Sequence, residues 1–299
     1  SQEPFNLCKL LAGSEGTLAF VTELKLRLVP LPPTEKAVVC VHCSTLEEAF
    51  VANLVVLKHN PVAIELMDST ILELSKRNIS QNKNRFFVQG DPAAILIIEL
   101  AENTREEVDK KADEIEADLR AHNYGTHYPR VYGKDISRVW SLRKAGLGLL
   151  SRMPGSAKPV SVIEDTAVAP QRLPAYIADM KKMLDGYGLS CVYHAHISTG
   201  ELHLRPVLNL KEEKDRKLFR TVATKTAELV KKHRGSLSGE HGDGRLRGEF
   251  IPLLLGDKVY SLLKEVKEIW DSPHIFNMGK IVDTPPMDAN LRYEQWDLG

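Results

Sequence analysis

The stretch Tyr193-His-Ala-His-Ile-Ser-Thr-Gly-Glu-Leu-His-Leu-Arg205 predicts a β-hairpin with three histidines and an arginine on one face. Apolar residues are frequent in both arms, and the Thr-Gly pair between them can form a two-residue turn. Because side chains alternate faces along a strand, the four polar groups point the same way. The predicted register places two pairs opposite each other: His196 with His203, and His194 with Arg205.

We interpret His196 and His203 as ligands of one metal ion. Opposed strand residues have Cβ atoms about 4.5–5.5 Å apart, which lets two imidazoles reach the same ion. The alternative is that each histidine is a half-buried polar residue with a hydrogen-bond partner. Three imidazoles beside an arginine repel one another on protonation, which favours the metal.

The composition predicts one large or two modest domains with a substantial core. The chain has 299 residues, 43% of them hydrophobic, and 40 acidic residues balance 40 basic ones. Zero net charge gives no electrostatic reason to expect a nucleic acid or an anionic membrane as partner. The sequence shows no apolar run of about 18 residues and no signal peptide, and its four cysteines are scattered. We expect reduced thiols and a cytoplasmic location.

The first thirty residues resemble the end of a domain more than its beginning. A glycine-containing turn at Leu11–Ala19 precedes an alternating strand, Val21–Leu28, and prolines then break the pattern. A hairpin of this size does not fold alone. We therefore expect the chain to be part of a longer protein.

From there on, strands and helices alternate. The pattern predicts an α+β fold in which helices cover one face of a mainly antiparallel sheet, leaving the other face for a ligand or another domain. The expected strands are 37–42, 94–100, 126–132 and 160–168, and the expected helices are 45–59, 104–122, 134–150, 171–184, 211–233 and 258–270.

The loop Ser238–Gly244 places a carboxylate and an imidazole side by side between glycines. Our hypothesis is that Glu240 joins His196 and His203 as third metal ligand, and that His241 faces the substrate as acid or base. Two histidines and one carboxylate leave coordination positions open, as catalytic Zn²⁺, Mn²⁺, Fe²⁺ or Co²⁺ sites do. The alternative for this loop is a solvated turn.

Further cationic groups are candidates for binding a carboxylate. They are Arg143, Lys158 and Arg205, of which only Arg205 is tied to the histidine face by spacing. The alternative for each is a solvated surface charge. The loop His274–Lys280 can offer amide and ammonium donors to a cofactor, or can simply end a helix.

Together, these motifs resemble the C-terminal part of FAD-linked oxidases of the vanillyl-alcohol oxidase type. That group includes D-lactate dehydrogenases, the glycolate oxidase flavin subunit and D-2-hydroxyglutarate dehydrogenases. Over residues 8–283, the resemblance rests on four segments in the family's order: Gly13–Leu18 (a flavin-contacting segment), the His-x6-His motif of the hairpin, the Glu-His pair in Gly239–Gly242, and Asn277-Met-Gly-Lys280 (the family's Asn-Pro-Gly-Lys).

The resemblance implies roles for individual residues. It makes His196, His203 and Glu240 ligands of a divalent metal, with Zn or Mn the first choice, and His241 the catalytic base. Arg143, in Trp140-Ser-Leu-Arg143, and Lys158 correspond to contacts with the substrate carboxylate, and we add His194 and Arg205 from the hairpin face. The expected cofactor-binding residues, for FAD, are Gly13, Ser14, Glu15, Gly16, Thr17, Asn277 and Lys280.

The chain also departs from the family pattern. Ser198-Thr-Gly-Glu201 replaces Gly-Asp-Gly-Asn, and Arg205 replaces a substrate-contacting Asn. The additional arginine favours a dicarboxylate. The implied domains are a remnant of the FAD-binding domain at 1–31, a ferredoxin-like cap domain at 32–285 and a linker at 286–299.

The implied function is the substrate- and metal-binding part of a flavin-dependent D-2-hydroxy-acid dehydrogenase. Its substrate would be of the glycolate, D-lactate or D-2-hydroxyglutarate type, oxidised to the 2-oxo acid. The expected partners are an FAD-binding lobe and an iron–sulfur module or quinone as electron acceptor, with any contact to a membrane surface only indirect. The alternatives are a substrate-binding cap without redox activity and a metal-dependent hydrolase using the same two-histidine, one-carboxylate site.

Overall fold

The computed structural model describes residues 4–289 and 291, and the chain divides into two compact units. We call residues 30–209 the sheet unit, and residues 1–29 together with 210–299 the helical unit. Most of the expected linker at 286–299 lies outside the described residues.

The sheet unit is built on an eight-stranded sheet whose described pairings are all antiparallel. The strand order is β4-β1-β3-β2-β7-β8-β5, and β6 also pairs with β8. The predicted α+β class with a mainly antiparallel sheet is confirmed. The strands are β1 (Glu35–Cys43), β2 (Ala63–Asp68), β3 (Ala94–Glu102), β4 (Arg130–Tyr132), β5 (Lys158–Pro159), β6 (Ile163–Ala167), β7 (Cys191–His196) and β8 (Glu201–Leu208).

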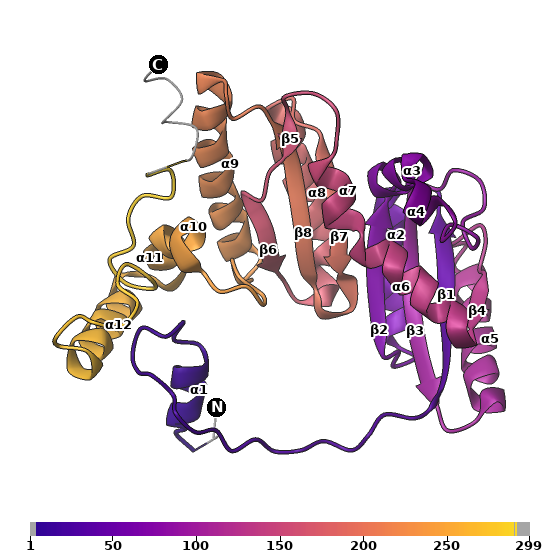
Figure 1. Ribbon diagram of the computed structural model, residues 1–299, viewed down its shortest axis with the longest axis horizontal. Coiled ribbons are helices and arrows are strands. Elements are labelled where there is room, and N and C mark those ends of the chain that lie inside the picture. Colours follow the sequence, from indigo (N-terminus) through magenta and orange to yellow (C-terminus); the bar gives the residue numbers. More distant parts are fainter. Residues whose placement is uncertain (1–3, 290, 292–299) are drawn as a thin grey trace. The chain divides into compact units, whose positions relative to one another are not determined.

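Helices pack on both faces of this sheet (Figure 1). One group contains α2 (Leu46–Leu57), α5 (Arg105–Ala121) and α8 (Leu173–Gly186), in which α2 contacts both other helices. On the face that we expected to be open, apolar residues of a second group pack against β1 and β3. This second group contains α3 (Ser69–Arg77), α6 (Ile136–Lys144) and α7 (Gly146–Ser151), and short helices fill the connections: α4 (Ile79–Asn82), η1 (Gly133–Asp135) and η2 (Pro170–Arg172).

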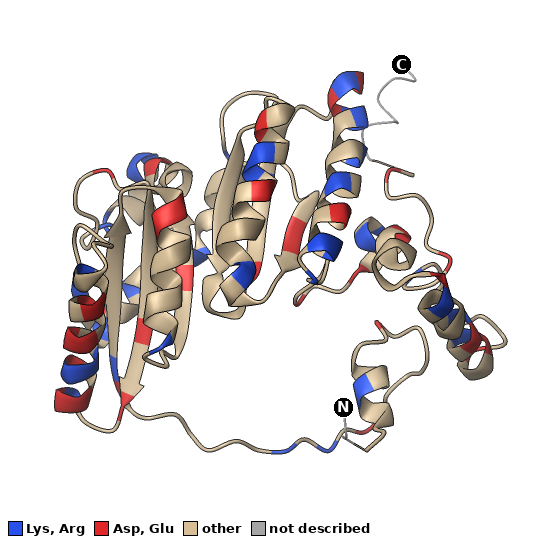
Figure 2. Cartoon of the chain, turned by 180° about the vertical axis from the view of Figure 1, so that it is seen from behind, with Lys and Arg blue, Asp and Glu red and all other residues tan. Residues whose placement is uncertain are grey.

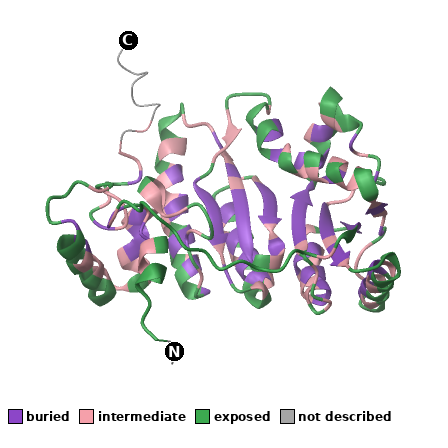
Figure 3. Cartoon of the chain, turned by 60° about the horizontal axis from the view of Figure 1, so that its bottom comes forward, coloured by how far each residue is buried: buried purple, intermediate pink, exposed green. Residues whose placement is uncertain are grey.

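Several expected elements differ in the structure. The helix expected at 134–150 is divided into η1, α6 and α7, and the strand expected at 160–168 is shortened to β6. Strand β2 and helix α3 were not predicted. The strand expected at 21–28 is absent: this segment pairs with no described strand and is exposed along its length (Figure 3). A single extended segment gains no ladder hydrogen bonds without a neighbouring strand edge.

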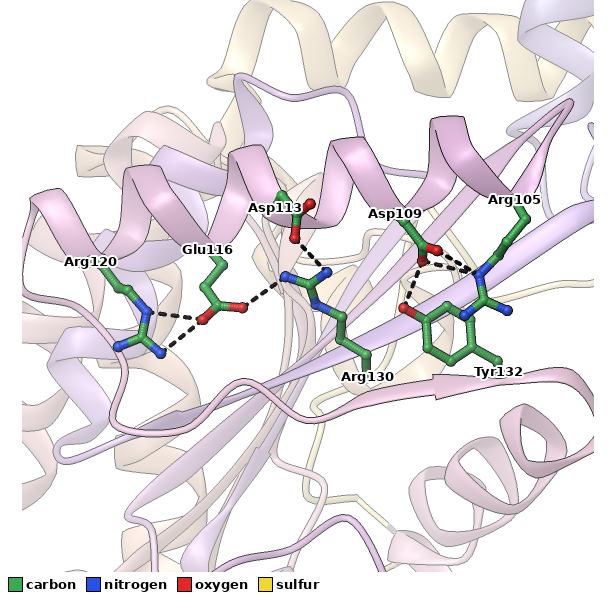
Figure 4. A network of polar contacts seen from close by, with 7 residues as sticks. All are labelled: Arg105, Asp109, Asp113, Glu116, Arg120, Arg130 and Tyr132. Carbon is green, nitrogen blue, oxygen red and sulfur yellow. Dashed lines mark hydrogen bonds and ion pairs between the residues drawn. The ribbon is translucent and has the colours of Figure 1, made fainter.

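Charged residues of α5 hold the edge strand β4. Arg130 forms ion pairs with Asp113 and Glu116, at 2.7 and 2.8 Å, and the Tyr132 hydroxyl donates to Asp109 at 2.8 Å (Figure 4). Figure 2 shows the mixed charges along the outer side of this helix. The network covers one side of an edge strand, whose free backbone groups would otherwise invite pairing with another chain.

The helical unit is tied together by a buried lysine on α12. Lys267 Nζ donates to the carbonyl oxygens of Thr17 and Phe276, both at 2.7 Å, and pairs with Asp271. Burial by itself raises the pKa of Asp271, but hydrogen bonds from Lys267 and two backbone N–H groups bring that pKa down to about 2. The helices are α1 (Leu7–Ala12), α9 (Glu213–Lys232), α10 (Gly244–Arg247), η4 (Gly248–Phe250), α11 (Ile251–Leu255) and α12 (Asp257–Trp270).

In the described part of the chain, every helix is too short or too polar to cross a bilayer.

Candidate active site

The histidine hairpin forms as predicted, but in a different register. His194 lies opposite His203, Val192 opposite Arg205, and His196 opposite Glu201. The predicted pairs are therefore wrong by two residues. A shift of two preserves the faces of all side chains, because the side-chain period of a strand is two. The three histidines and Arg205 still share one face.

The register is set by a four-residue turn in place of the predicted two-residue turn. Residues Ile197–Thr199 form the 3-10 helix η3, and Gly200 closes the turn at φ 83°. A Cβ at Gly200 would lie 1.8 Å from the carbonyl oxygen of Val168, so a side chain has no room there. Asn53 of α2, fully buried, donates to the Ile197 carbonyl at 3.2 Å and holds the turn against the helix.

Strand β2, which the sequence analysis missed, contributes a carboxylate to this face. Glu65 Oε1 lies 2.7 Å from Nδ1 of His196, and Glu65 Oε2 lies 2.8 Å from a guanidinium nitrogen of Arg143 on α6. A carboxylate only accepts, so Nδ1 of His196 carries the proton in this hydrogen bond. The hydrogen bond to Glu65 also raises the pKa of His196.

His203 lies between two further carboxylates. Its Nδ1 is 3.7 Å from Glu164 of β6, and its Nε2 is 3.7 Å from Glu201. The rings of His196 and His203 are 5.0 Å apart between centroids and are nearly perpendicular. One ligand atom each of His196, His203 and Glu201 lies within 4.8 Å of the others. The predicted convergence of the two imidazoles is therefore present within the sheet unit.

His194 is a buried neutral imidazole in a cationic environment. Its ring centroid lies 4.9 Å from that of His203, and only 7% of the residue is exposed. Burial, reinforced by Arg143, His203 and Arg205, lowers the pKa of His194 to about 2. Neither of its ring nitrogens has a hydrogen-bond partner among the described residues.

The predicted carboxylate-binding cations have partners from the protein itself. Arg205 pairs with both oxygens of Glu164 at 2.5 Å, and Lys158 donates to the Met153 carbonyl. Unused donors remain, however. Nε of Arg205 and Nε of Arg143 are buried without a hydrogen-bond partner in the described part of the chain, whereas Nη2 of Arg143 forms the ion pair with Glu65. These N–H groups are available to an anionic ligand.

In the helical unit, the predicted flavin-contacting segments come together. Asn277 Nδ2 donates to the Glu15 carbonyl at 2.6 Å, and the Glu15 carboxylate accepts from the backbone N–H groups of Asp243 and Gly244 at 2.6 and 3.0 Å. Glu15, Gly16 and Asn277 all have positive φ, so each lies in a constrained turn. Glu15 thus anchors the loop that carries Glu240 and His241.

The hydroxyl groups of the first predicted cofactor segment donate hydrogen bonds to nearby backbone carbonyls. Ser14 donates to Leu11 O at 2.8 Å and Thr17 to Ser14 O at 2.6 Å. The segment can therefore offer mainly backbone groups to a cofactor. Gly13, Ser14 and Thr17 also line a cavity of about 540 Å³ in the helical unit. Lys280 follows Asn277 in the same closing loop.

Glu240 and His241 also lie in the helical unit, so the joint three-ligand set with His196 and His203 remains a prediction. Nε2 of His241 is 3.4 Å from Glu240 Oε1, and both side chains are about half exposed. Sequence reasoning missed the three carboxylates of the histidine face, Glu65, Glu164 and Glu201. The apolar run around Glu65 was an available strand signal, whereas the proximity of Glu164 required the tertiary fold.

Comparisons with known proteins agree with this architecture. The family described as FAD linked oxidases, C-terminal domain, matches residues 32–281. D-2-hydroxyglutarate dehydrogenase of Pseudomonas putida is 33% identical over 288 residues, which are 94% of this chain and 28% of that protein. Glycolate oxidase subunit GlcD of Bacillus subtilis is 24% identical over 283 residues, covering 93% of this chain and 57% of that protein.

Among solved structures, 4-ethylphenol oxidase from Gulosibacter chungangensis superposes with a TM-score of 0.60 at 13% identity, covering 84% of this chain and 54% of that one. At this identity the likeness concerns the fold alone. The chain spans less than a third of the Pseudomonas protein and somewhat more than half of the other two proteins. It belongs to the FAD-linked oxidase C-terminal domain family.

Proposed function

We propose that this chain is the substrate- and metal-binding part of an FAD-dependent dehydrogenase that oxidises a D-2-hydroxy acid to the 2-oxo acid. The observation that carries the proposal is the histidine face of the sheet unit. There two converging imidazoles lie beside buried arginine N–H groups that have no hydrogen-bond partner in the described part of the chain. A 2-hydroxy acid presents the matching chemistry, a hydroxyl group next to a carboxylate.

The cationic side chains of this face would bind the substrate. Arg143 and Arg205 each offer Nε to carboxylate oxygens, while Lys158 adds a compact positive charge. His194, neutral because burial lowers its pKa to about 2, can donate one hydrogen bond without adding charge. Together these groups would fix the acid and orient C2.

The residues also fit a divalent metal. His196, His203 and Glu240 would hold it, and Glu65 orients His196 through Nδ1. When bound, the metal would supply Lewis-acid polarisation of the substrate hydroxyl. When bound, FAD would supply the acceptor for the hydrogen leaving C2, and Gly13, Ser14, Glu15, Gly16, Thr17, Asn277 and Lys280 are the residues proposed to contact it.

His241 is the proposed general base. Its exposed imidazole, on a loop held by Glu15, would accept the hydroxyl proton at Nε2 or Nδ1 as C2 is oxidised. The Glu15 anchor joins this loop to the proposed flavin-contacting segment, which favours a role for His241 close to the cofactor.

Within this class we favour a dicarboxylate of the 2-hydroxyglutarate type. Arg143 and Arg205 each retain at least one buried N–H without a hydrogen-bond partner among the described residues, which allows one arginine for each carboxylate. Several relatives at 30–33% identity are named D-2-hydroxyglutarate dehydrogenase, which agrees with this choice.

The test is dye-linked oxidation of D-2-hydroxyglutarate and D-lactate by the protein that includes the FAD-binding part. We expect a higher kcat/KM for the dicarboxylate. His241→Asn should lower kcat about 10²–10⁴-fold and leave substrate affinity nearly unchanged. Near-normal turnover of this variant would exclude His241 as the base, and the absence of oxidation of any D-2-hydroxy acid would refute the function.

A further inference from the structure

Strand β6 contains an unusual backbone conformation directly beside the histidine face. Asp165 is fully buried and has a φ of 76°, which residues other than glycine adopt uncommonly. The pairing of β6 with β8 shifts by one residue there: Glu164 lies opposite His203, and the next residue to pair is Thr166. Asp165 is therefore the extra residue of a β-bulge, and bulges often lie next to active sites, where they turn a side chain in a new direction.

The bulge places its two neighbours on opposite faces of the sheet. In a regular strand, Glu164 and Thr166 would share a face, because side chains alternate with a period of two. Here the Thr166 hydroxyl accepts from the Tyr176 hydroxyl of α8 at 3.1 Å. Glu164 instead lies on the histidine face, where it contacts His203 and Arg205. The bulge thus directs the Glu164 carboxylate at Arg205.

Glu164 holds one nitrogen of Arg205 and leaves another available. Both oxygens of the Glu164 carboxylate accept from Nη2 of Arg205, and these side chains are only 10% and 11% exposed. Nε of Arg205 is buried and has no hydrogen-bond partner among the described residues. A guanidinium that is fixed at one nitrogen presents its remaining N–H groups in a defined direction, which suits a carboxylate ligand.

The two arginines of the histidine face lie at different levels along the hairpin. Glu65 joins Arg143 to His196, which is next to the turn. Arg205 lies two residues beyond His203, away from the turn, or about 6.4–6.8 Å further along β8. The carboxyl carbons of a five-carbon dicarboxylate are about 5 Å apart. Two arginines so placed can each bind one carboxylate of such an acid.

We propose that Glu164 is a positioning residue, which fixes Arg205 so that Arg205 binds the second carboxylate of a dicarboxylate substrate. Arg143 then binds the carboxylate next to the hydroxyl group. The inference rests on the proposed function for the substrate class and adds the residue that sets the preference. Glu164 acts through Arg205 and does not touch the substrate. Removing Glu164 therefore affects only acids with a second carboxylate, and only while Arg205 is present.

The experiment compares acids that differ in one group. D-2-hydroxyglutarate and 2-oxoglutarate carry the second carboxylate, whereas D-2-hydroxypentanoate and 2-oxopentanoate carry a methyl group in its place. Dye-linked oxidation by the protein that includes the FAD-binding part gives kcat and KM for the hydroxy acids. Calorimetry with the same protein gives Kd for the oxo acids. The variants are Glu164→Gln, Glu164→Asp, Arg205→Gln and the double variant Glu164→Gln/Arg205→Gln.

Glu116→Gln is the matched control, because Glu116 forms a partly buried pair with Arg130 elsewhere in the sheet unit. Circular dichroism establishes that each variant is folded. Glu164→Asp covers the case in which Glu164→Gln does not fold. It keeps the negative charge beside Arg205 and withdraws the carboxylate by one C–C bond, about 1.5 Å.

We expect Glu164→Gln to raise KM for D-2-hydroxyglutarate and Kd for 2-oxoglutarate by about 10-fold or more, with kcat changed by less than about 3-fold. Glu164→Asp should raise the same two constants by about 3-fold or more, because the guanidinium is held less firmly. For the acids without a second carboxylate, and for 2-oxoglutarate when Arg205 is already replaced, loss of Glu164 should change the constants by less than about 2-fold. Glu116→Gln should match the wild type.

Several results would overturn the inference. Equal losses for both kinds of acid would assign Glu164 to the support of His203 instead. An unchanged or lower KM for the dicarboxylate in Glu164→Gln, or a further loss of its binding where Arg205 is already replaced, would show that Glu164 does not act by positioning Arg205. A wild type that binds 2-oxoglutarate no better than 2-oxopentanoate would remove the role of Arg205 itself.

Binding and turnover separate this inference from the proposed function. A protein that oxidises D-2-hydroxy acids but shows any of these contrary results retains its function and loses the role of Glu164. A protein that oxidises no D-2-hydroxy acid loses the proposed function. The inference then stands if the preference for 2-oxoglutarate over 2-oxopentanoate depends on Glu164, and falls if it does not.

Discussion

The two units hold their candidate functional groups in different ways. In the sheet unit, His194, Glu201 and His203 are buried on paired strands. In the helical unit, Glu240 and His241 have half-exposed side chains on a glycine-flanked loop that is held through its backbone by Glu15. The candidate groups of the sheet unit are therefore held on a rigid scaffold, whereas the geometry of the loop depends on a few anchors.

The largest expected effect is a loss of stability in the helical unit. Lys267→Met removes the charge that pairs with buried Asp271 and the donors to Thr17 and Phe276. An unpaired buried charge typically costs roughly 3–5 kcal/mol, and we expect a loss of that size in the free energy of unfolding. Hydrogen exchange should show lost protection in the helical unit, with the hairpin of the sheet unit much less affected.

A matched control lies on the same helix. Lys264 pairs with Asp283 at 2.7 Å, but both side chains are largely exposed. Lys264→Met should therefore change stability by less than about 1 kcal/mol. Equal effects of the two substitutions would show that Lys267 does not hold the unit together.

The next largest effect is the pH dependence of the stability of the sheet unit. Asp68 accepts from the N–H groups of Ile71 and Tyr193, linking β2 to α3 and β7, and burial raises the pKa of Asp68 to about 6. The folded state thus holds this proton more tightly than the unfolded state. The resulting stability is complete below pH 3.8 and is lost as pH rises through 6, in total about 2–3 kcal/mol.

Asp68→Asn removes this titration, although its amide nitrogen cannot accept, so one of the two hydrogen bonds is lost. Urea unfolding at a series of pH values should show a smaller decline between pH 4 and 7 in the variant than in the wild type. Parallel curves for the two proteins would contradict the assigned pKa.

A smaller effect is expected at Glu65, which supports a proposed metal ligand. Glu65→Gln keeps the shape of the side chain but loses the charge that orients His196 and pairs with Arg143. We expect a 10–100-fold loss of Co²⁺ affinity, the usual cost of removing such a support. Glu99→Gln on neighbouring β3, whose carboxylate pairs with Lys36, should leave the affinity unchanged. If both variants bind equally well, Glu65 does not position His196.

The smallest effect concerns the surface network of β4. Arg130→Ala removes the ion pairs with Asp113 and Glu116 at a partly exposed site. Thermal unfolding should report a loss of about 1 kcal/mol or less, since such pairs contribute little. A loss of stability as large as that of Lys267→Met would show that these surface ion pairs stabilise the protein as much as the buried lysine does.

The sequence allowed the face of the hairpin to be predicted but not its register. Alternation depends on sequence parity alone, so His194, His196 and His203 were placed together correctly. The register depends on the turn, which the steric demand at Gly200 against Val168 sets, and that contact appears only in the fold.

Contacts between residues far apart in the sequence were harder to predict. Glu65 is 131 residues before His196 in the chain, and no local pattern links the two. Likewise, the contact of Asn277 with Glu15 spans 262 residues, and only the family resemblance suggested that these segments serve one cofactor. The roles of Glu240 and His241 stay predictions for the same reason.

Anomalous diffraction at the zinc edge, from crystals of the protein grown with Zn²⁺, would reveal whether His196 and His203 share one ion. We expect one strong peak about 2.0–2.2 Å from a nitrogen of His196 and a nitrogen of His203. An ordered structure with no peak between these two imidazoles, each making only hydrogen bonds within the protein, would contradict this expectation.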